Sequence, residues 1–170
     1  SSFFNAVAIQ EHCDQKKIVG AGSSDGKWVL ARYNENGSLD TQFGDISAIK
    51  TNMIGEINSI AIQKDNKIVV AGYNTFDTSN TQIALMRFNG DDGTLDTDFG
   101  SQGIIFTPVN NFSSINGVAI QEDNKIVVVG TVKTGNRNDM FVARYDEYGT
   151  LDTSFGLNGD GTITMQIGRD

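Results

Sequence analysis

The sequence contains a single cysteine, Cys13, and a single histidine, His12, which stand side by side. A lone cysteine excludes a disulfide within the chain, and two such residues are too few for a zinc site built from four Cys or His ligands. A nucleophilic Cys–His pair also needs hydrogen-bond geometry and a third orienting group. We therefore expect neither metal binding nor catalysis at this position.

Proline, positive charge and long apolar runs are also scarce. Thirteen Lys and Arg residues stand against twenty-one Asp and Glu, which gives a formal net charge of −8 without any basic cluster. Such a chain repels phosphate backbones, so no nucleic-acid partner is expected. No apolar run approaches the ~18 residues of a membrane span. One proline and nineteen glycines are typical of many short strands joined by tight turns.

The sequence does contain one pattern that occurs three times in the same order. The first element is NAVAIQ (5–10), NSIAIQ (58–63) and NGVAIQ (116–121), and the second is KIVGAG (17–22), KIVVAG (67–72) and KIVVVG (125–130). The third is LARYNENGSLDTQFG (30–44), LMRFNGDDGTLDTDFG (85–100) and VARYDEYGTLDTSFG (142–156). Val- and Ile-rich segments bounded by Gly, Asn and Asp indicate β-strands. The polar links 64–67 and 122–125 are typical of tight hairpin turns, where Asn tolerates positive φ.

We name the three elements strands a, b and c, and a fourth strand d is expected after each LDTxFG turn. Strand d is clearest at 103–109 and 161–167 and weaker at 45–51. The sequence thus predicts an all-β fold of twelve strands in three antiparallel four-stranded meanders. Meanders that repeat at roughly 40 to 60 residues are typical of β-propeller blades. We expect one domain over 1–170, with blades at about 1–52, 53–110 and 111–170.

Three blades are too few to surround a channel, because propellers typically have about four to eight. Either two chains combine or the native polypeptide is longer. Closed cyclic symmetry favours the two-fold dimer. The sequence therefore predicts a homo-oligomer, preferably a homodimer of six blades.

The LDTxFG turn and the AIQxDNKIVVxG strand pair resemble the bacterial delta-sixty β-propeller repeat and, more distantly, the NHL propeller repeat. The resemblance covers essentially the whole chain, although Asn66 and Asn124 stand where that repeat commonly has glycine. It implies a propeller of no fixed chemistry. By analogy, strand a would lie innermost and strand d outermost, with the d–a and b–c loops on the usual ligand face. A secreted or cell-surface location is expected.

An asparagine opens strand a in each repeat, at Asn5, Asn58 and Asn116. These amides would form a ring at the channel rim, where they could bind a sugar or another polar ligand. The same side chains can instead bond backbone groups in the d–a turn, which is the usual habit of asparagine. Identity in every repeat favours the structural role.

An arginine lies among apolar neighbours on strand c in each repeat, and such a residue needs a partner. We predict a latch in which Arg32, Arg87 and Arg144 pair with the LDT aspartates Asp40, Asp96 and Asp152. The same turns have some likeness to a calcium loop. If the loop is aligned on its glycine and aspartate, however, Arg32 or Arg144 would stand at the first ligand position. A positively charged side chain cannot bind a hard cation, which needs oxygen ligands. No metal and no cofactor is expected.

The b–c loops (23–27, 73–82 and 131–139) differ between the repeats and are the best places to search for a ligand site. Their candidate binding residues are Tyr73, Phe76, Asp77, Lys133 and Arg137. Ordinary solvated loops are the alternative. Trp28 could also stack on a sugar, but it aligns with Ile83 and Met140, which favours packing inside the sheet.

Strand a offers mainly amides, which are poor general bases, at Gln10, Gln63 and Gln121. Glu56 is the one carboxylate near an entry to strand a. We therefore expect a non-catalytic module that recognises a carbohydrate or protein ligand and takes part in assembly. A propeller hydrolase or lyase with a site at the channel mouth stays open, as does a purely structural surface-assembly protein.

Overall fold

The computed structural model describes residues 1–12, 14–45, 48–77, 80–107 and 113–166, and these residues form β-strands without any helix. The strands are β1 (Ser2–His12), β2 (Gln15–Ser24), β3 (Lys27–Asn34), β4 (Ala48–Ile62), β5 (Ile68–Asp77), β6 (Asn80–Phe88), β7 (Ile104–Thr107), β8 (Ser114–Ile120), β9 (Ile126–Thr134), β10 (Arg137–Tyr145) and β11 (Thr162–Met165). Within these ranges there is accordingly no helix long and apolar enough to cross a membrane.

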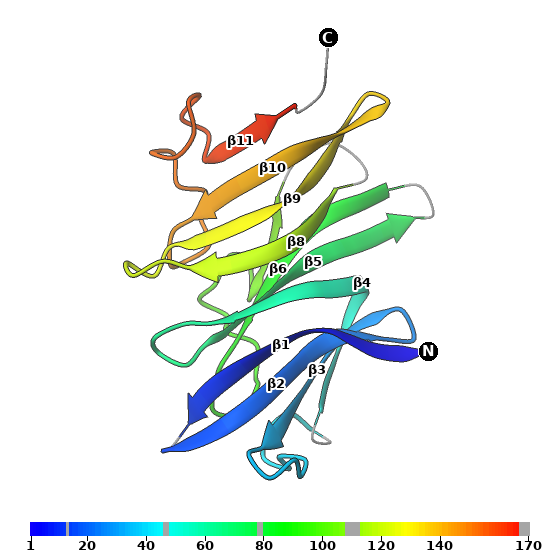
Figure 1. Ribbon diagram of the computed structural model, residues 1–170, viewed down its shortest axis with the longest axis vertical. Coiled ribbons are helices and arrows are strands. Elements are labelled where there is room, and N and C mark those ends of the chain that lie inside the picture. The colour runs from blue at the N-terminus through cyan, green and yellow to red at the C-terminus, as the bar shows by residue number, and fades with distance from the viewer. Residues whose placement is uncertain (13, 46–47, 78–79, 108–112, 167–170) are drawn as a thin grey trace.

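The strands pair as three antiparallel four-stranded meanders, as predicted. Blade 1 is β1, β2, β3 and the first half of β4, and blade 2 is the second half of β4 with β5, β6 and β7. Blade 3 is β8 to β11. The blades follow one another along the longest axis, with blade 1 at the bottom and blade 3 at the top (Figure 1). The described sheets do not close into a ring.

Strand β4 corrects the prediction of twelve separate strands, because it joins strand d of blade 1 to strand a of blade 2. It pairs with β3 as far as Ile54 and with β5 from Gly55 onward. Gly55 has a φ of 138°, and a Cβ atom there would lie 2.1 Å from the carbonyl oxygen of Tyr73. Only glycine fits this position, so the chain changes partner without a break in the strand.

The turns between strands a and b follow the sequence pattern closely in blades 2 and 3. Asn66 and Asn124 have φ values of 66° and 65°. Both residues therefore occupy the left-handed region that asparagine tolerates better than other side chains, as their place in the turns predicted.

The hydrophobic core lies between the blades and not within any one of them. One cluster joins blades 1 and 2 and includes Val19, Trp28, Leu30, Phe43, Ile68, Val70, Met86 and Phe88. The other joins blades 2 and 3 and includes Val69, Ile83, Leu85, Phe99, Ile126, Val128, Phe141 and Tyr145. We call these two interfaces the first and second seams. Each sheet thus needs a neighbour to bury its apolar face.

Candidate functional site

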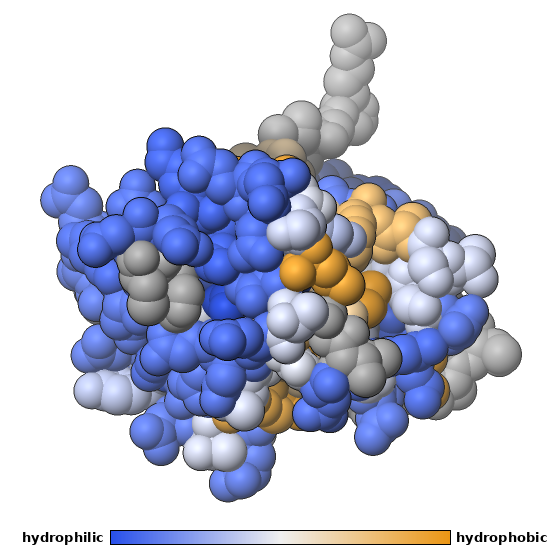
Figure 2. Space-filling view, turned by 90° about the horizontal axis from the view of Figure 1, so that it is seen from below, coloured by the Kyte–Doolittle hydropathy of each residue, from blue (hydrophilic) through white to orange (hydrophobic). Residues whose placement is uncertain are grey.

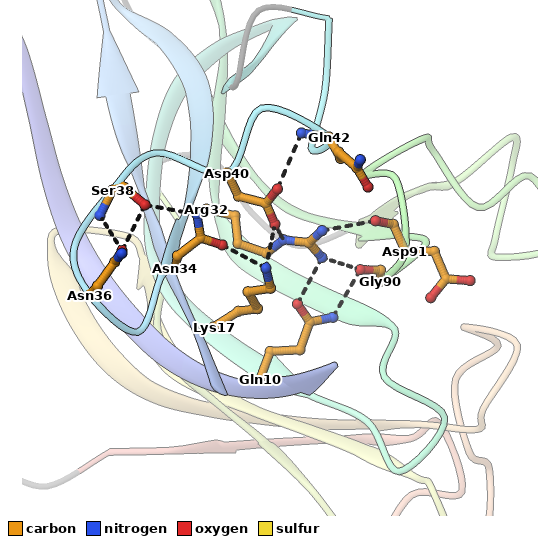
Figure 3. A network of polar contacts seen from close by, with 10 residues as sticks. All are labelled: Gln10, Lys17, Arg32, Asn34, Asn36, Ser38, Asp40, Gln42, Gly90 and Asp91. Atoms are coloured by element: carbon orange, nitrogen blue, oxygen red, sulfur yellow. Dashed lines mark hydrogen bonds and ion pairs between the residues drawn. The ribbon is translucent and has the colours of Figure 1, made fainter. Parts of the chain in front are cut away.

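An extensive polar network surrounds Arg32 on β3 (Figure 3). Its Nε donates to Asp40 Oδ2 at 2.8 Å, and its guanidinium lies 4.4 Å from the centre of the Phe43 ring. Nη1 donates to Gln10 Oε1 at 3.1 Å and to the carbonyl of Gly90, and Nη2 donates to the carbonyl of Asp91 at 2.9 Å. Because Gly90 and Asp91 belong to blade 2, Arg32 joins two blades.

Blade 2 repeats this arrangement with Arg87. Its Nε donates to Asp96 Oδ2 at 2.6 Å, and its guanidinium lies 4.5 Å from the centre of the Phe99 ring. Nη1 donates to Gln63 Oε1 at 3.3 Å and to the carbonyl of Glu147 in blade 3. Arg32 and Arg87 therefore have equivalent roles at the first and second seams.

Blade 3 has those contacts of the arrangement that lie within a single blade. Arg144 Nε donates to Asp152 Oδ2 at 2.8 Å, and the guanidinium lies 4.7 Å from the centre of the Phe155 ring. Its Nη2 donates to Ser154 Oγ at 3.2 Å. The side chain of Arg144 is 20% exposed, against 1% for Arg32. The structure thus pairs each arginine with the aspartate that the sequence had suggested.

A lysine from strand b adds a second cation to each of these aspartates. Lys17, Lys67 and Lys125 lie 3.2, 3.0 and 3.4 Å from Asp40, Asp96 and Asp152. Burial alone would raise the pKa of Asp40, but the backbone N–H of Gln42 and the charges of Arg32 and Lys17 outweigh it and lower that pKa. Each aspartate is in this way held in its ionised form.

The same balance sets the pKa values of the two later aspartates. Burial raises the pKa of Asp96, and contacts with Lys67 and Arg87 bring it below its ordinary value. At Asp152 the hydrogen bond from the Ser154 hydroxyl is the largest cause of a pKa well below the usual range. Carboxylates held so firmly in the ionised form are poor proton carriers at neutral pH.

The asparagines that open strand a do not present their amides to a ligand in the first two blades. Asn5 Nδ2 donates to the carbonyl of Ile57 at 3.1 Å. Asn58 Nδ2 donates to the carbonyl of Ile115 and to Ser114 Oγ, both at 3.0 Å. These bonds cross the two seams, whereas Asn116 in blade 3 is exposed. The observed role of Asn5 and Asn58 is thus structural. Their hydrogen bonds go to the neighbouring blade, however, and not to backbone groups within the d–a turn.

Gln10 has a role that sequence reasoning missed, because its amide was weighed only as a poor base. It is completely buried and donates Nε2 to the carbonyls of Asn66 and Gly90, at 3.0 and 3.1 Å. It also accepts from Arg32. Its identity in all three repeats was the available signal for this role.

Trp28 was a candidate for stacking on a sugar, and the structure shows that it cannot serve in this way. The residue is 0% exposed in the first seam, and its indole Nε1 donates to the carbonyl of Tyr73 at 3.0 Å. The alignment with Ile83, which is also fully buried, explains this position. Both faces of the indole ring are covered by protein.

The loop candidates lie on two different blades. Tyr73 on β5 pairs across the strands with Glu56 on β4, and burial, with the Glu56 carboxylate beside it, raises the pKa of the phenol. Lys133 and Arg137 lie in blade 3 at the β9–β10 hairpin, where Arg137 is exposed. Phe76 and Asp77 belong to β5, but their side chains lie outside the described part of the chain, as does Cys13.

A cavity of about 640 Å³ opens along the first seam, between the outer strand of blade 1 and the sheet of blade 2. Its walls are mostly apolar and include Ile49, Met53, Met86, Phe88, Leu95 and Ile104. In the second seam, the hydroxyl of Tyr145 is hydrogen-bonded to Thr107 at the equivalent place. Phe88 lacks that hydroxyl, so the first seam has no such bridge between Phe88 and Thr51. No group of three or more His, Cys, Asp or Glu residues placed to hold a metal ion occurs in the described ranges.

Comparison with known families agrees with this repeat geometry. The sequence matches the family described as "Domain of unknown function (DUF5122) beta-propeller" over residues 16–43, 63–99 and 121–155, one match in each blade. Together these matches cover more than half of the chain. No curated protein matches the sequence. The chain belongs to the DUF5122 beta-propeller family.

Proposed function

We propose that the protein is a non-catalytic recognition and assembly module that works as a closed propeller of six blades, made by two copies of the chain. The observation that carries the proposal is that the recurring charged residues are engaged in contacts within and between the blades. Arg32 and Arg87 donate to backbone carbonyls of the following blade, and each is held in place by an aspartate of its own blade that also pairs with a lysine. The most regular polar groups of the sequence therefore serve the architecture, and chemistry would have to come from elsewhere.

The b–c loops are the surface that we propose for ligand recognition. They combine an aromatic residue, Tyr73, with an exposed cation, Arg137, on neighbouring blades. They are also the segments that differ most between the repeats, as expected where binding and not packing sets the sequence. Burial of Trp28 removes the best platform for a sugar, which favours a protein ligand over a carbohydrate. The likeness to delta-sixty and NHL repeats supports a secreted or cell-surface location.

A glycan array with the intact chain tests the carbohydrate branch. If the b–c loops bind a sugar, Tyr73→Ala and Arg137→Ala should reduce the signal at least tenfold, about 1.4 kcal/mol. Tyr148→Ala is the matched control, because Tyr148 is exposed in the turn between strands c and d, at the opposite end of the strands. An array without any signal would reject carbohydrate recognition and leave protein recognition and assembly.

The same material tests the claim that the module is non-catalytic. Any glycan that binds is incubated with the protein, and its mass is measured over time. We expect the glycan to remain intact. Its cleavage would contradict the proposal and support the hydrolase or lyase alternative, for which Glu56 beside Tyr73 would be the first carboxylate to replace.

A further inference from the structure

Each blade has two apolar faces, which we call the leading face, toward the following blade, and the trailing face, toward the preceding one. The leading faces of blades 1 and 2 carry equivalent residues at five positions, all of them buried: Val19, Ala21, Trp28, Leu30 and Phe43 in blade 1, and Val69, Ala71, Ile83, Leu85 and Phe99 in blade 2. The trailing faces of blades 2 and 3 are equally apolar and meet them in the seams.

The leading face of blade 3 has the same apolar character but is exposed at two of the five positions and only partly buried at the other three. Its equivalent residues are Val127, Val129, Met140, Val142 and Phe155. Val129 is 45% and Met140 43% exposed, whereas Ala71 and Ile83, which occupy the same positions in blade 2, are fully buried. An exposed apolar surface of this kind marks an interaction site.

The trailing face of blade 1 is partly exposed at the other end of the molecule. Val7 and Ile9 are 65% and 57% exposed, whereas their equivalents Ile60 and Ile62 pack against the core of the first seam. Figure 2, which looks at the molecule from the blade 1 end, shows apolar side chains gathered among polar ones. The ring of Phe4 lies over Gly20, where a Cβ atom would be only 3.3 Å away.

Three hydrogen bonds occur at both seams, always from one blade to the following one. The asparagine of strand a donates to a backbone carbonyl, from Asn5 to Ile57 and from Asn58 to Ile115. The arginine of strand c donates to the turn of the next blade, from Arg32 to Gly90 and from Arg87 to Glu147.

The third bond comes from the backbone N–H of the glycine that ends each LDTxFG turn. Gly44 donates to the carbonyl of Asp92 at 2.9 Å, and Gly100 to that of Tyr148 at 2.8 Å. All three donors recur in blade 3, as Asn116, Arg144 and Gly156. The corresponding acceptors are present in blade 1, as the carbonyls of Phe4, Glu35 and Asn36.

We infer that the leading face of blade 3 packs on the trailing face of blade 1 of a second copy, and that this seam forms twice in a closed ring. This seam rests on the proposed function and adds to it the two faces that meet and the contacts between them. In this seam Asn116 of one copy donates to the carbonyl of Phe4 of the other copy, Arg144 to that of Glu35 and Gly156 to that of Asn36. The same three bonds form again at the second seam between the two copies. Six is the only multiple of three among the four to eight blades that propellers typically have, so one further copy completes the ring.

Charged substitutions on the two open faces test the seam, because Val7 and Val129 are exposed in the single chain, where a charged side chain at either position remains in contact with water. Light scattering should give about twice the 18.4 kDa chain mass for the unchanged protein. Val7→Asp and Val129→Lys should each give the mass of one chain. The matched control is Ile54→Asp, which replaces a comparably exposed apolar residue that lines the open cavity of the first seam, away from both open faces, and should leave the dimer intact. Circular dichroism checks that all variants are folded.

Mixing the two single-chain variants then tests which faces meet. A pair of one Val7→Asp chain and one Val129→Lys chain keeps one unaltered seam, so the mixture should recover a dimer that neither variant forms alone. Pairing of like faces would instead leave one of the variants dimeric and the other beyond rescue. That result, or the single-chain mass for the unchanged protein, would overturn the inference. Ligand recognition by the b–c loops can still be measured on the Val7→Asp chain, so a failure of the seam is distinguishable from a failure of the proposed ligand recognition.

Discussion

At the residue scale, Arg32 and Arg87 each join an aspartate of their own blade to a backbone carbonyl of the following blade. The arginine and the LDT aspartate are eight or nine residues apart in every repeat, so a local ion pair could be expected from spacing and from the cost of burying a lone cation. The carbonyls of Gly90 and Asp91 belong to the next repeat, and a backbone acceptor leaves no mark in a sequence. Gln10 was missed for the same reason, because its partners include two backbone carbonyls.

The seam aspartates make stability depend on pH. The pKa values of Asp40 and Asp96 are lowered from the ordinary 3.8 in the folded chain, so their contribution is complete above that value and is lost as the pH falls through the folded-state pKa. We expect the free energy of unfolding, measured with urea, to decrease as the pH falls below about 4. Asp96→Asn should reduce the slope of the free energy of unfolding against pH in this range, and Asp98→Asn, at an exposed position, should not. Equal slopes for the unchanged protein and Asp96→Asn would contradict this assignment.

At the element scale, alternation of apolar and polar residues located the strands but not the points where one strand continues into another. The weak pattern over 45–51 suggested a separate strand d, whereas β4 runs from Ala48 to Ile62 and serves two blades. Side chains alternate with a period of two residues both before and after such a change of partner strand, so the sequence pattern does not reveal it. Trp28 was ambiguous for a related reason, because a residue beside a loop can point into a seam or into solvent.

The bend in β4 gives a prediction at this scale, which is that Gly55→Ala is far more damaging than Gly26→Ala. Both glycines have positive φ, but a Cβ atom at Gly55 would lie 2.1 Å from the carbonyl oxygen of Tyr73, and one at Gly26 would have no neighbour within 4 Å. Gly26→Ala should lower the free energy of unfolding by about 1 kcal/mol, the cost of the left-handed backbone. Gly55→Ala should cost at least about 3 kcal/mol, because the backbone of β5 must also move. Similar losses for the two variants, measured by urea denaturation, would show that the close approach is not rigid.

At the scale of the whole molecule, the repeat predicted blades but could not predict which faces are left open. Val129 and Ala71 occupy the same position in the pattern, yet one is half exposed and the other is buried. The difference comes only from the order of the blades along the chain. A core that lies between sheets leaves one sheet at each end of the array with a face to cover, as in other repeat proteins whose units contact only their neighbours.

Closure by a second copy should therefore couple stability to protein concentration. If unfolding of the native state also separates two chains, mass action raises the melting temperature as the concentration rises. For two chains of 170 residues, a hundredfold increase should raise the melting temperature by about 4 °C, given the usual entropy of unfolding per residue. The Val7→Asp chain should melt at one temperature at every concentration, because its uncovered face no longer accepts a partner. An unchanged protein whose melting temperature stayed constant over that range would mean that the open faces contribute nothing to the stable fold.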